Sequence, residues 1–398
     1  MKKDIFITGA GIISALGLGK EKTLQALQNG TSGIGSMQHL QTIHNQFPVG
    51  EVTYSDEELR EILKISKDRV TTRTTLLGMV ALQEALEQAQ LQNRDNLRVA
   101  FISGTTVGGM EKSEQYYLDF LENDTKNAYI AAHDCGVCTE MIADHFGGFK
   151  RISTISTACS SAENAIILGA EMIKSGLVDI AVAGGSECLT KFHLNGFNTL
   201  MILDKQHCRP FDRDRAGINL GEGAAYVVLE SSESLEKRGV QSLCRLSGYA
   251  NTCDAYHQTA SSPEGIGAFL AMQKALEQAN LQASDINYIN AHGTGTDNND
   301  VSEGAAIMKL FGEQIPAVSS TKMYTGHTTS AAGSVESVVS ILAMLNDFVP
   351  ANLNFQNKIE ELSFEPVHGK SKTCEVQHVL KNSFGFGGNN TSLIFSKK

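Results

Sequence analysis

The sequence is poor in proline, carries no excess of positive charge and contains no long hydrophobic run. Six of its 398 residues are proline and 37 are glycine, which favours tight turns and close approaches between backbone segments. The formal net charge of −11 argues against a general binder of nucleic acid or of membrane surfaces, because both functions need a positive field. No apolar stretch is long enough to span a membrane, so we expect no membrane insertion.

Signals for secretion and for metal binding are also missing. The N-terminal segment MKKDIFITGAG lacks the apolar run and the cleavage site of a signal peptide. The eight cysteines are scattered and do not form a disulfide framework, which predicts a reducing cytoplasmic location. The only C-x-x-C, at Cys135 and Cys138 beside His133, has no further ligands at zinc-like spacing, so we expect no metal site.

What is present is the composition of a soluble enzyme, with 41% hydrophobic and 19% charged residues. Strand patterns alternate with helical patterns, which predicts an α/β fold with mostly parallel or mixed sheets. From about Arg245 the order of elements begins again, as a faint internal duplication. We therefore expect two fused halves, residues 1–245 and 246–398.

The stretch Arg151–Lys174 joins a strand pattern to a long, mostly apolar helix, and Cys159 lies at the junction. A thiol at a helix N-terminus feels unpaired N–H groups and the positive end of the helix dipole. This setting predicts a lowered pKa and a nucleophilic thiolate. The alternative is a small buried cysteine that only packs against the helix.

Two further loops that follow strands carry histidines, His292 in NAHGTGT and His327 in STKMYTGH. Ligands in α/β folds bind beyond the carboxyl ends of strands, so the three loops are expected to share one site. A cysteine with two imidazoles suits acyl-thioester chemistry, in which the thiolate takes an acyl group and ring N–H groups stabilise negative charge on oxygen. Lys322 either tunes the imidazoles or is paired with an acid such as Glu336.

Two other stretches permit an alternative or a partner. The glycines of ITGAGIISALG suggest a dinucleotide site, and hence a nicotinamide-dependent oxidoreductase, but their spacing is not G-x-G-x-x-G. The segment LKISKDRVTTR carries Lys64, Lys67, Arg69 and Arg73. It is either a solvated helix face or the landing site of an acidic partner.

Several motifs together resemble one family. The segments TACSS, AHGTGT, STKMYTGH and NSFGFGG, with GGSE, PFDRDRAG, DAYH and AAGSVES, are similar to the signature loops of the elongating, Cys-His-His β-ketoacyl-acyl-carrier-protein synthases. The resemblance follows the family's order over nearly the whole chain. It implies the thiolase-like fold, with two similar halves of stacked mixed five-stranded sheets and layered helices, usually as a dimer and without a cofactor.

The resemblance also implies a reaction, the decarboxylative Claisen condensation of an acyl thioester with malonyl carrier protein in fatty-acid, polyene or polyketide elongation. Cys159 would accept the acyl chain, while His292 and His327 would promote decarboxylation and stabilise the enolate. The backbone N–H groups of Cys159 and Phe386 would form an oxyanion hole. Phe386 would also gate the acyl pocket, with Gly385 and Gly387 giving it freedom to move.

Other positions match family residues that bind substrates. Thr294 and Thr296, with Thr259 as a weaker candidate, match positions that line the pantetheine tunnel. Asp254 matches an acid that steadies the neighbouring mobile loop, and Val107 matches a residue at the floor of the acyl pocket. The basic cluster Lys64, Lys67 and Arg69 would then receive acyl carrier protein.

The chain departs from the common family pattern in three places, one of which is the segment from Glu111 to Asp144, shorter than in typical members. Glu163, in SSAENA, adds a charge near the central helix, and the bulky Leu200, Met201 and Ile202 are expected to narrow the pocket. Some family members act beside a cysteine-lacking chain-length subunit. The chain is therefore expected to form a homodimer or to be the active half of a heterodimer, since a non-catalytic subunit would lack Cys159.

Overall fold

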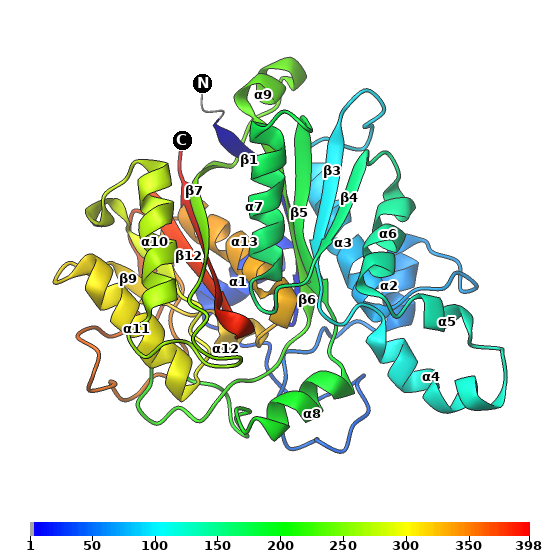
Figure 1. The fold of residues 1–398 in the computed structure, drawn as a ribbon, viewed down its shortest axis with the longest axis horizontal. Helices are drawn as coiled ribbons and strands as arrows, with labels where there is room; N and C mark the ends of the chain where they lie inside the picture. The colour runs from blue at the N-terminus through cyan, green and yellow to red at the C-terminus, as the bar shows by residue number, and fades with distance from the viewer. Residues whose placement is uncertain (1–3) are drawn as a thin grey trace.

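The computed structural model describes residues 4–398, in which strands and helices alternate as the sequence predicts (Figure 1). The strands are β1 (Ile5–Ser14), β2 (Gly17–Leu18), β3 (Val99–Gly104), β4 (Arg151–Ile155), β5 (Ile180–Glu187), β6 (Gly223–Ser231), β7 (Cys244–Cys253), β8 (Tyr288–Asn290), β9 (Ala317–Ser319), β10 (Phe348–Val349), β11 (Lys372–Thr373), β12 (His378–Gly385) and β13 (Asn389–Ser396). The helices are α1 (Lys20–Asn29), α2 (Asp56–Leu63), α3 (Arg73–Gln88), α4 (Met110–Glu122), α5 (Ala128–Ala131), α6 (Cys135–Phe146), α7 (Ser161–Lys174), α8 (Lys191–Thr199), α9 (Ser232–Arg238), α10 (Ile266–Ala279), α11 (Asp297–Phe311), α12 (Lys322–Thr325) and α13 (Ala332–Leu345).

The strand order is the same in the two halves of the chain. In the N-terminal half it is β4-β3-β5-β6-β1, with two parallel pairings followed by two antiparallel ones. In the C-terminal half it is β9-β8-β12-β13-β7, with the same succession of parallel and antiparallel pairings. The predicted architecture of two similar halves, each with a mixed five-stranded sheet, is confirmed.

The two sheets are not separate at every point. Strands β1 and β7 pair antiparallel over three residues, from Ile5–Leu246 to Ile7–Cys244, so the backbone hydrogen bonding is continuous from one half to the other. Helices α7 and α13 lie between the sheets, because each contacts strands of both halves. Helices α3 and α6 cover the outer face of the first sheet, and α10 covers that of the second with α11 beside it. The sequence of layers is therefore helix, sheet, helix, sheet, helix.

The middle layer explains why its helices read as apolar on most sides. All but the last residue of α13 are buried, and so is most of α7. A helix enclosed by two sheets has no solvated face to carry charges. The few buried charges on these helices, Glu163 and Glu336, therefore need partners within the protein.

The glycine-rich segment near the N-terminus is not a turn. Gly9 and Gly11 lie inside strand β1, which continues to Ser14. A Cβ on Gly9 would lie 2.3 Å from the carbonyl oxygen of Ala85, and one on Gly11 would lie 2.1 Å from that of Ala81. These glycines let β1 approach helix α3, so the dinucleotide-loop interpretation of ITGAGIISALG is wrong. Within residues 4–398, no helix is long and apolar enough to cross a bilayer.

Candidate active site

Cys159 sits on a sharp elbow between β4 and α7. The residue before it, Ala158, has φ +51°, a left-handed backbone conformation that residues other than glycine rarely adopt. Residual strain of this kind persists where the surroundings fix the backbone, often at functional sites. The elbow directs the thiol toward the C-terminal half, where Sγ lies 3.1 Å from Nε2 of His327.

The second histidine completes a compact trio. The rings of His292 and His327 are 5.4 Å apart and nearly perpendicular. The sulfur of Cys159 and one nitrogen of each ring lie within 4.8 Å of one another. Three loops that are far apart in the sequence therefore meet at one point.

The structure corrects the expected ionisation of the thiol. Cys159 is 7% exposed, and burial raises its pKa to about 12, an effect opposed by the Lys322 ammonium and reinforced by the carboxylates of Glu187 and Glu336. The helix N-terminus does not outweigh the loss of water around the sulfur. The resting group is thus a thiol, and the nearest proton acceptor is His327.

Both imidazoles are neutral. Burial is the main cause that holds the pKa of His292 and that of His327 well below the usual value, and the nearby ammonium groups of Lys322 and Lys381 act in the same direction. Lys322 Nζ lies 3.3 Å from Nδ1 of His292. Because an ammonium can only donate, Nδ1 accepts, and the proton of the His292 ring is on Nε2.

The two interpretations of Lys322 both hold. Its Nζ lies 2.5 Å from the carbonyl oxygen of His292 and 2.5 Å from Oε1 of Glu336, in addition to its contact with the imidazole. The three donors of one ammonium therefore face three acceptors. Lys322 positions His292 and is at the same time paired with an acid.

Two carboxylates that the sequence analysis missed hold the loop of His292. Glu303 accepts hydrogen bonds from the backbone N–H groups of His292 and Gly293, at 2.9 and 2.8 Å. Asp300 accepts from those of Thr294 and Gly295, at 3.0 and 3.2 Å. The two acids are three residues apart on α11, hence on one face of the helix that directly follows AHGTGT. That spacing was a signal available in the sequence.

A cavity of about 270 Å³ opens onto the trio. It is lined by Cys159, His292 and His327, by Gly385 and Phe386, and by the hydroxyl residues Thr259, Thr294 and Thr296. Met201 and Ile202 also line it, but Leu200, the third bulky residue expected to narrow the pocket, does not. Val107 does not line this cavity, since its side chain is buried in the core beneath the outer helices of the first sheet.

The GFGG loop closes one wall of the cavity. A Cβ on Gly385 would lie 3.3 Å from the backbone nitrogen of Cys159, so glycine permits the two chain segments to come together. The ring of Phe386 stacks on that of Phe197 from α8, with centroids 5.9 Å apart. Gly387 has φ +82°, a conformation that glycine adopts without strain. Asp254 lies outside the cavity, directly against Gly388 of this loop.

Comparisons with known proteins agree with this geometry. A family model described as "Beta-ketoacyl synthase, N-terminal domain" matches residues 2–234, and one described as "Beta-ketoacyl synthase, C-terminal domain" matches residues 243–356. The chain belongs to the β-ketoacyl synthase family. It is 33% identical to a 3-oxoacyl-[acyl-carrier-protein] synthase 2 of Synechocystis, over 100% of this chain and 98% of the relative.

Solved structures of this family are similar over the whole chain. The ishigamide ketosynthase/chain length factor has a TM-score of 0.92 and 28% identity, with full coverage of both chains. A ketosynthase in complex with its chain length factor from Xenorhabdus doucetiae has a TM-score of 0.82 and 31% identity, covering 100% of this chain and 98% of that one.

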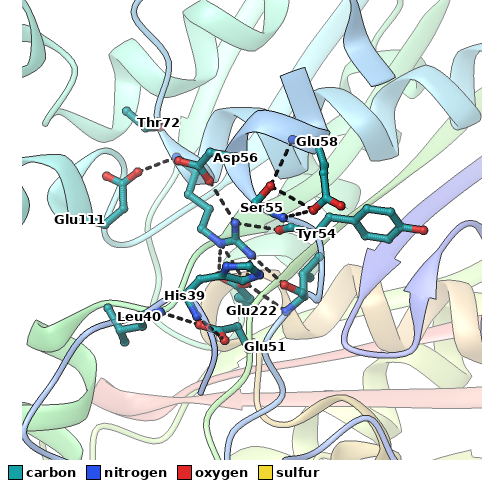
Figure 2. A network of polar contacts seen from close by, with 12 residues as sticks. His39, Leu40, Glu51, Tyr54, Ser55, Asp56, Glu58, Thr72, Glu111 and Glu222 are labelled. Atoms are coloured by element: carbon teal, nitrogen blue, oxygen red, sulfur yellow. Dashed lines mark hydrogen bonds and ion pairs between the residues drawn. The ribbon is translucent and has the colours of Figure 1, made fainter. Parts of the chain in front are cut away.

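In this β-ketoacyl synthase the basic cluster loses one member. Lys64 and Lys67 are exposed, and Arg69 is half-buried with Nη1 3.2 Å from Nδ1 of His145. Arg73 is buried instead, and its guanidinium is paired with Glu222 at 2.6 Å and with Asp56 at 3.0 Å. Figure 2 shows both carboxylates, with Glu111, in this polar network. Of the four basic residues of this segment, Lys64, Lys67 and Arg69 therefore remain at the surface.

Proposed function

We propose that the chain catalyses the decarboxylative Claisen condensation of an acyl thioester with malonyl-acyl carrier protein. The observation that carries this proposal is the convergence of one thiol and two neutral imidazoles at the end of a cavity. A neutral imidazole can both accept a proton and donate a hydrogen bond, which is what thioester exchange and enolate stabilisation require.

In the first half-reaction, Sγ of Cys159 attacks the carbonyl carbon of the incoming acyl thioester. The thiol proton passes to Nε2 of His327, which lies 3.1 Å away. The backbone N–H groups of Cys159 and Phe386 receive the developing oxyanion. The C–S bond to the carrier breaks, and the carrier thiolate leaves with a proton from His327.

In the second half-reaction, the thioester oxygen of the malonyl group faces the Nε2–H group of His292, with the ring of His327 beside it. Loss of carbon dioxide leaves the electron pair as an enolate, whose oxygen this N–H group stabilises. The enolate carbon attacks the acyl-Cys159 thioester, the C–S bond to Cys159 breaks, and Sγ leaves as a thiolate that takes a proton from solvent. Lys322, in contact with Nδ1 of His292, supports this role by keeping the proton on Nε2.

Acyl carrier protein is the proposed donor of both substrates. Thr259, Thr294 and Thr296 offer hydroxyl groups to a pantetheine arm, and the hydroxyls of Thr294 and Thr296 lie 2.8 Å apart. Asp254, which lies against Gly388, would steady the GFGG loop. The exposed Lys64 and Lys67, with Arg69, would attract the acidic carrier.

A related subunit is the proposed partner, as in the ketosynthase/chain length factor structures that this chain resembles. Two exposed features support it. Strand β4 is the edge of the first sheet, and Ile152 on it is 40% exposed. Helix α4 presents Tyr117, Leu118 and Leu121, each more than 60% exposed. We place the enzyme in the reducing cytoplasm, since all eight cysteines are free thiols.

The test is to load the purified enzyme with acyl carrier protein and identify the modified residue by mass spectrometry. We expect an acyl adduct on Cys159 that disappears on addition of malonyl carrier protein. Cys159→Ala should lose the adduct and condensation while still releasing carbon dioxide from malonyl carrier protein. Condensation by that variant at the normal rate would refute the proposal.

A further inference from the structure

Two buried carboxylates, one from the central helix of each half, meet at a single lysine. Glu163 of α7 and Glu336 of α13 flank Lys381 of β12, whose Nζ lies 3.2 Å from Oε1 of Glu163 and 2.9 Å from Oε2 of Glu336. The side chains of Lys381 and Glu163 are fully buried, and that of Glu336 is 2% exposed. Lys381 also lies 3.1 Å from the hydroxyl of Ser383.

This cluster is contiguous with the active site. The other oxygen of Glu336, Oε1, accepts a hydrogen bond from Nζ of Lys322. Lys322 in turn contacts both Nδ1 and the carbonyl oxygen of His292. The four groups therefore form a chain of alternating charge, Glu163–Lys381–Glu336–Lys322, that ends on an imidazole. Two positive and two negative charges leave it neutral.

Stability alone does not account for such a cluster. Transfer of charges into the protein interior carries a desolvation cost that their mutual attraction only partly offsets. Well-packed hydrophobic residues of similar volume are often as stable or more stable in such places. The ions do, however, fix relative positions, because an ion pair with hydrogen-bonded partners has one geometry whereas apolar contacts tolerate sliding.

The positions that the cluster fixes are those of the reaction. Glu163 is in the first turn of α7, four residues after Cys159. Lys381 is on β12, which ends at Gly385, next to Phe386. The two proposed oxyanion-hole donors thus belong to the two segments that the Glu163–Lys381 pair joins. Beside Glu163, a Cβ on Gly333 of α13 would lie only 2.6 Å from Cγ of Glu163. The two central helices are therefore in close contact at this point.

We propose that Glu163 and Lys381 are positioning residues for the condensation: their ion pair sets the start of α7 against the end of β12, and through Glu336 it holds Lys322 on His292. This inference rests on the proposed function. The cation of Lys381 also favours the neutral form of both imidazoles, in the same direction as burial and Lys322. The other ionisable groups around the two rings are Cys159, His193, Glu303 and Glu336.

The test removes the pair without leaving a lone buried charge, in the double variant Glu163→Gln with Lys381→Met. We expect kcat for condensation to fall by about 10- to 100-fold, as for other losses of alignment on the scale of an ångström. The KM for malonyl carrier protein should stay within about twofold, because neither residue lines the cavity. The acid limb of the kcat profile should move to higher pH, because a cation near both imidazoles is lost.

A second variant guards against failure to fold. Glu163→Gln alone keeps the size of the side chain and its hydrogen bond to Ser383, 3.1 Å away. In this variant Glu336, which also binds Lys322, is the one remaining carboxylate that the structure places beside Lys381. We expect a smaller loss of kcat, about three- to tenfold, because the alignment of the catalytic groups is disturbed less and substrate binding is unaffected.

The matched control is another buried ion pair, Arg238 of α9 with Glu230 of β6, at the end of the molecule remote from the site (Figure 1). Glu230→Gln with Arg238→Met should lower the melting temperature but leave kcat and the pH profile unchanged. A double variant at Glu163 and Lys381 that behaves like this control would overturn the inference.

One readout separates this inference from the proposed function. Nitrogen-15 NMR of labelled histidines follows imidazole protonation without any substrate. In the double variant we expect His292 and His327 to take up protons at higher pH than in the wild type; unchanged titration would overturn the inference whatever the enzyme's substrates are. Absence of condensation by the wild-type enzyme would instead count against the proposed function alone.

Discussion

The two halves of the molecule share one strand order but carry different chemistry at equivalent places. Counted along the chain, β4 is the third of the five strands in the first sheet and β9 is the third of the five in the second. Cys159 follows β4, and His327 follows β9. The loop after β8 supplies His292, whereas the equivalent loop after β3 supplies only Val107 and its neighbours. The two halves therefore share their strand order, but the nucleophile lies in the first half and both imidazoles lie in the second.

The most direct test of this difference is to remove a catalytic side chain from one half and to measure acylation and decarboxylation separately. His292→Ala should reduce decarboxylation of malonyl carrier protein by about 100- to 1000-fold, the usual cost of a lost oxyanion donor. Acylation of Cys159 should persist, because the thiol keeps His327 as its proton acceptor. Acyl-adduct mass spectrometry and carbon dioxide release measure the two activities. Loss of both activities in His292→Ala would contradict a division of labour between the halves.

The two halves hold their second-strand loops with acids from different elements. Glu303 of α11 accepts hydrogen bonds from the backbone N–H groups of His292 and Gly293, and Glu187 of β5 accepts those of Thr106 and Val107 in the equivalent loop. Glu303→Ala should destabilise the enzyme by about 2–4 kcal/mol, since buried N–H groups lose their partner. Chemical denaturation measures this loss. The hydroxyl-removing variant Thr296→Val, on the same loop, is the control and should change stability by less than about 1 kcal/mol.

The pH dependence of the thiol sharpens the comparison between the cysteine and its imidazole neighbours. Because the pKa of Cys159 is raised to about 12, the thiol is protonated at neutral pH and the thiolate fraction grows with each pH unit up to that value. The alkylation rate with iodoacetamide should therefore rise steadily from pH 7 to pH 10. A plateau below pH 8 would mean that the helix N-terminus does lower the pKa.

The smallest effect is expected on the surface of the N-terminal half. Reversing the charges of Lys64, Lys67 and Arg69 to glutamate should raise the KM for carrier protein by about three- to tenfold at low salt. The effect should shrink as salt is added, because exposed charges are screened. The control is Lys370→Glu with Lys372→Glu, exposed lysines of the C-terminal half. An equal effect of both sets would show that net charge, not the patch, decides.

Much of the fold was predictable because local pattern and tertiary environment agree. The apolar character of α7 and α13 indicates enclosure between two sheets, and the loops of Cys159, His292 and His327 all follow strands. The glycines of β1 suggested a dinucleotide-binding loop, because the sequence alone does not distinguish a glycine in a strand from a glycine in a turn. Only the contact with α3 distinguishes them.

The sequence by itself determined the alternation of elements, the duplication and the residue types of the active site, because these depend on periodicity and on neighbours along the chain. The tertiary structure alone decided the protonation of Cys159, the burial of Arg73 and the meeting of Glu163 and Glu336 at Lys381. Each of these depends on how much water and which charges surround a group, and those surroundings come from distant segments, some of them more than two hundred residues away.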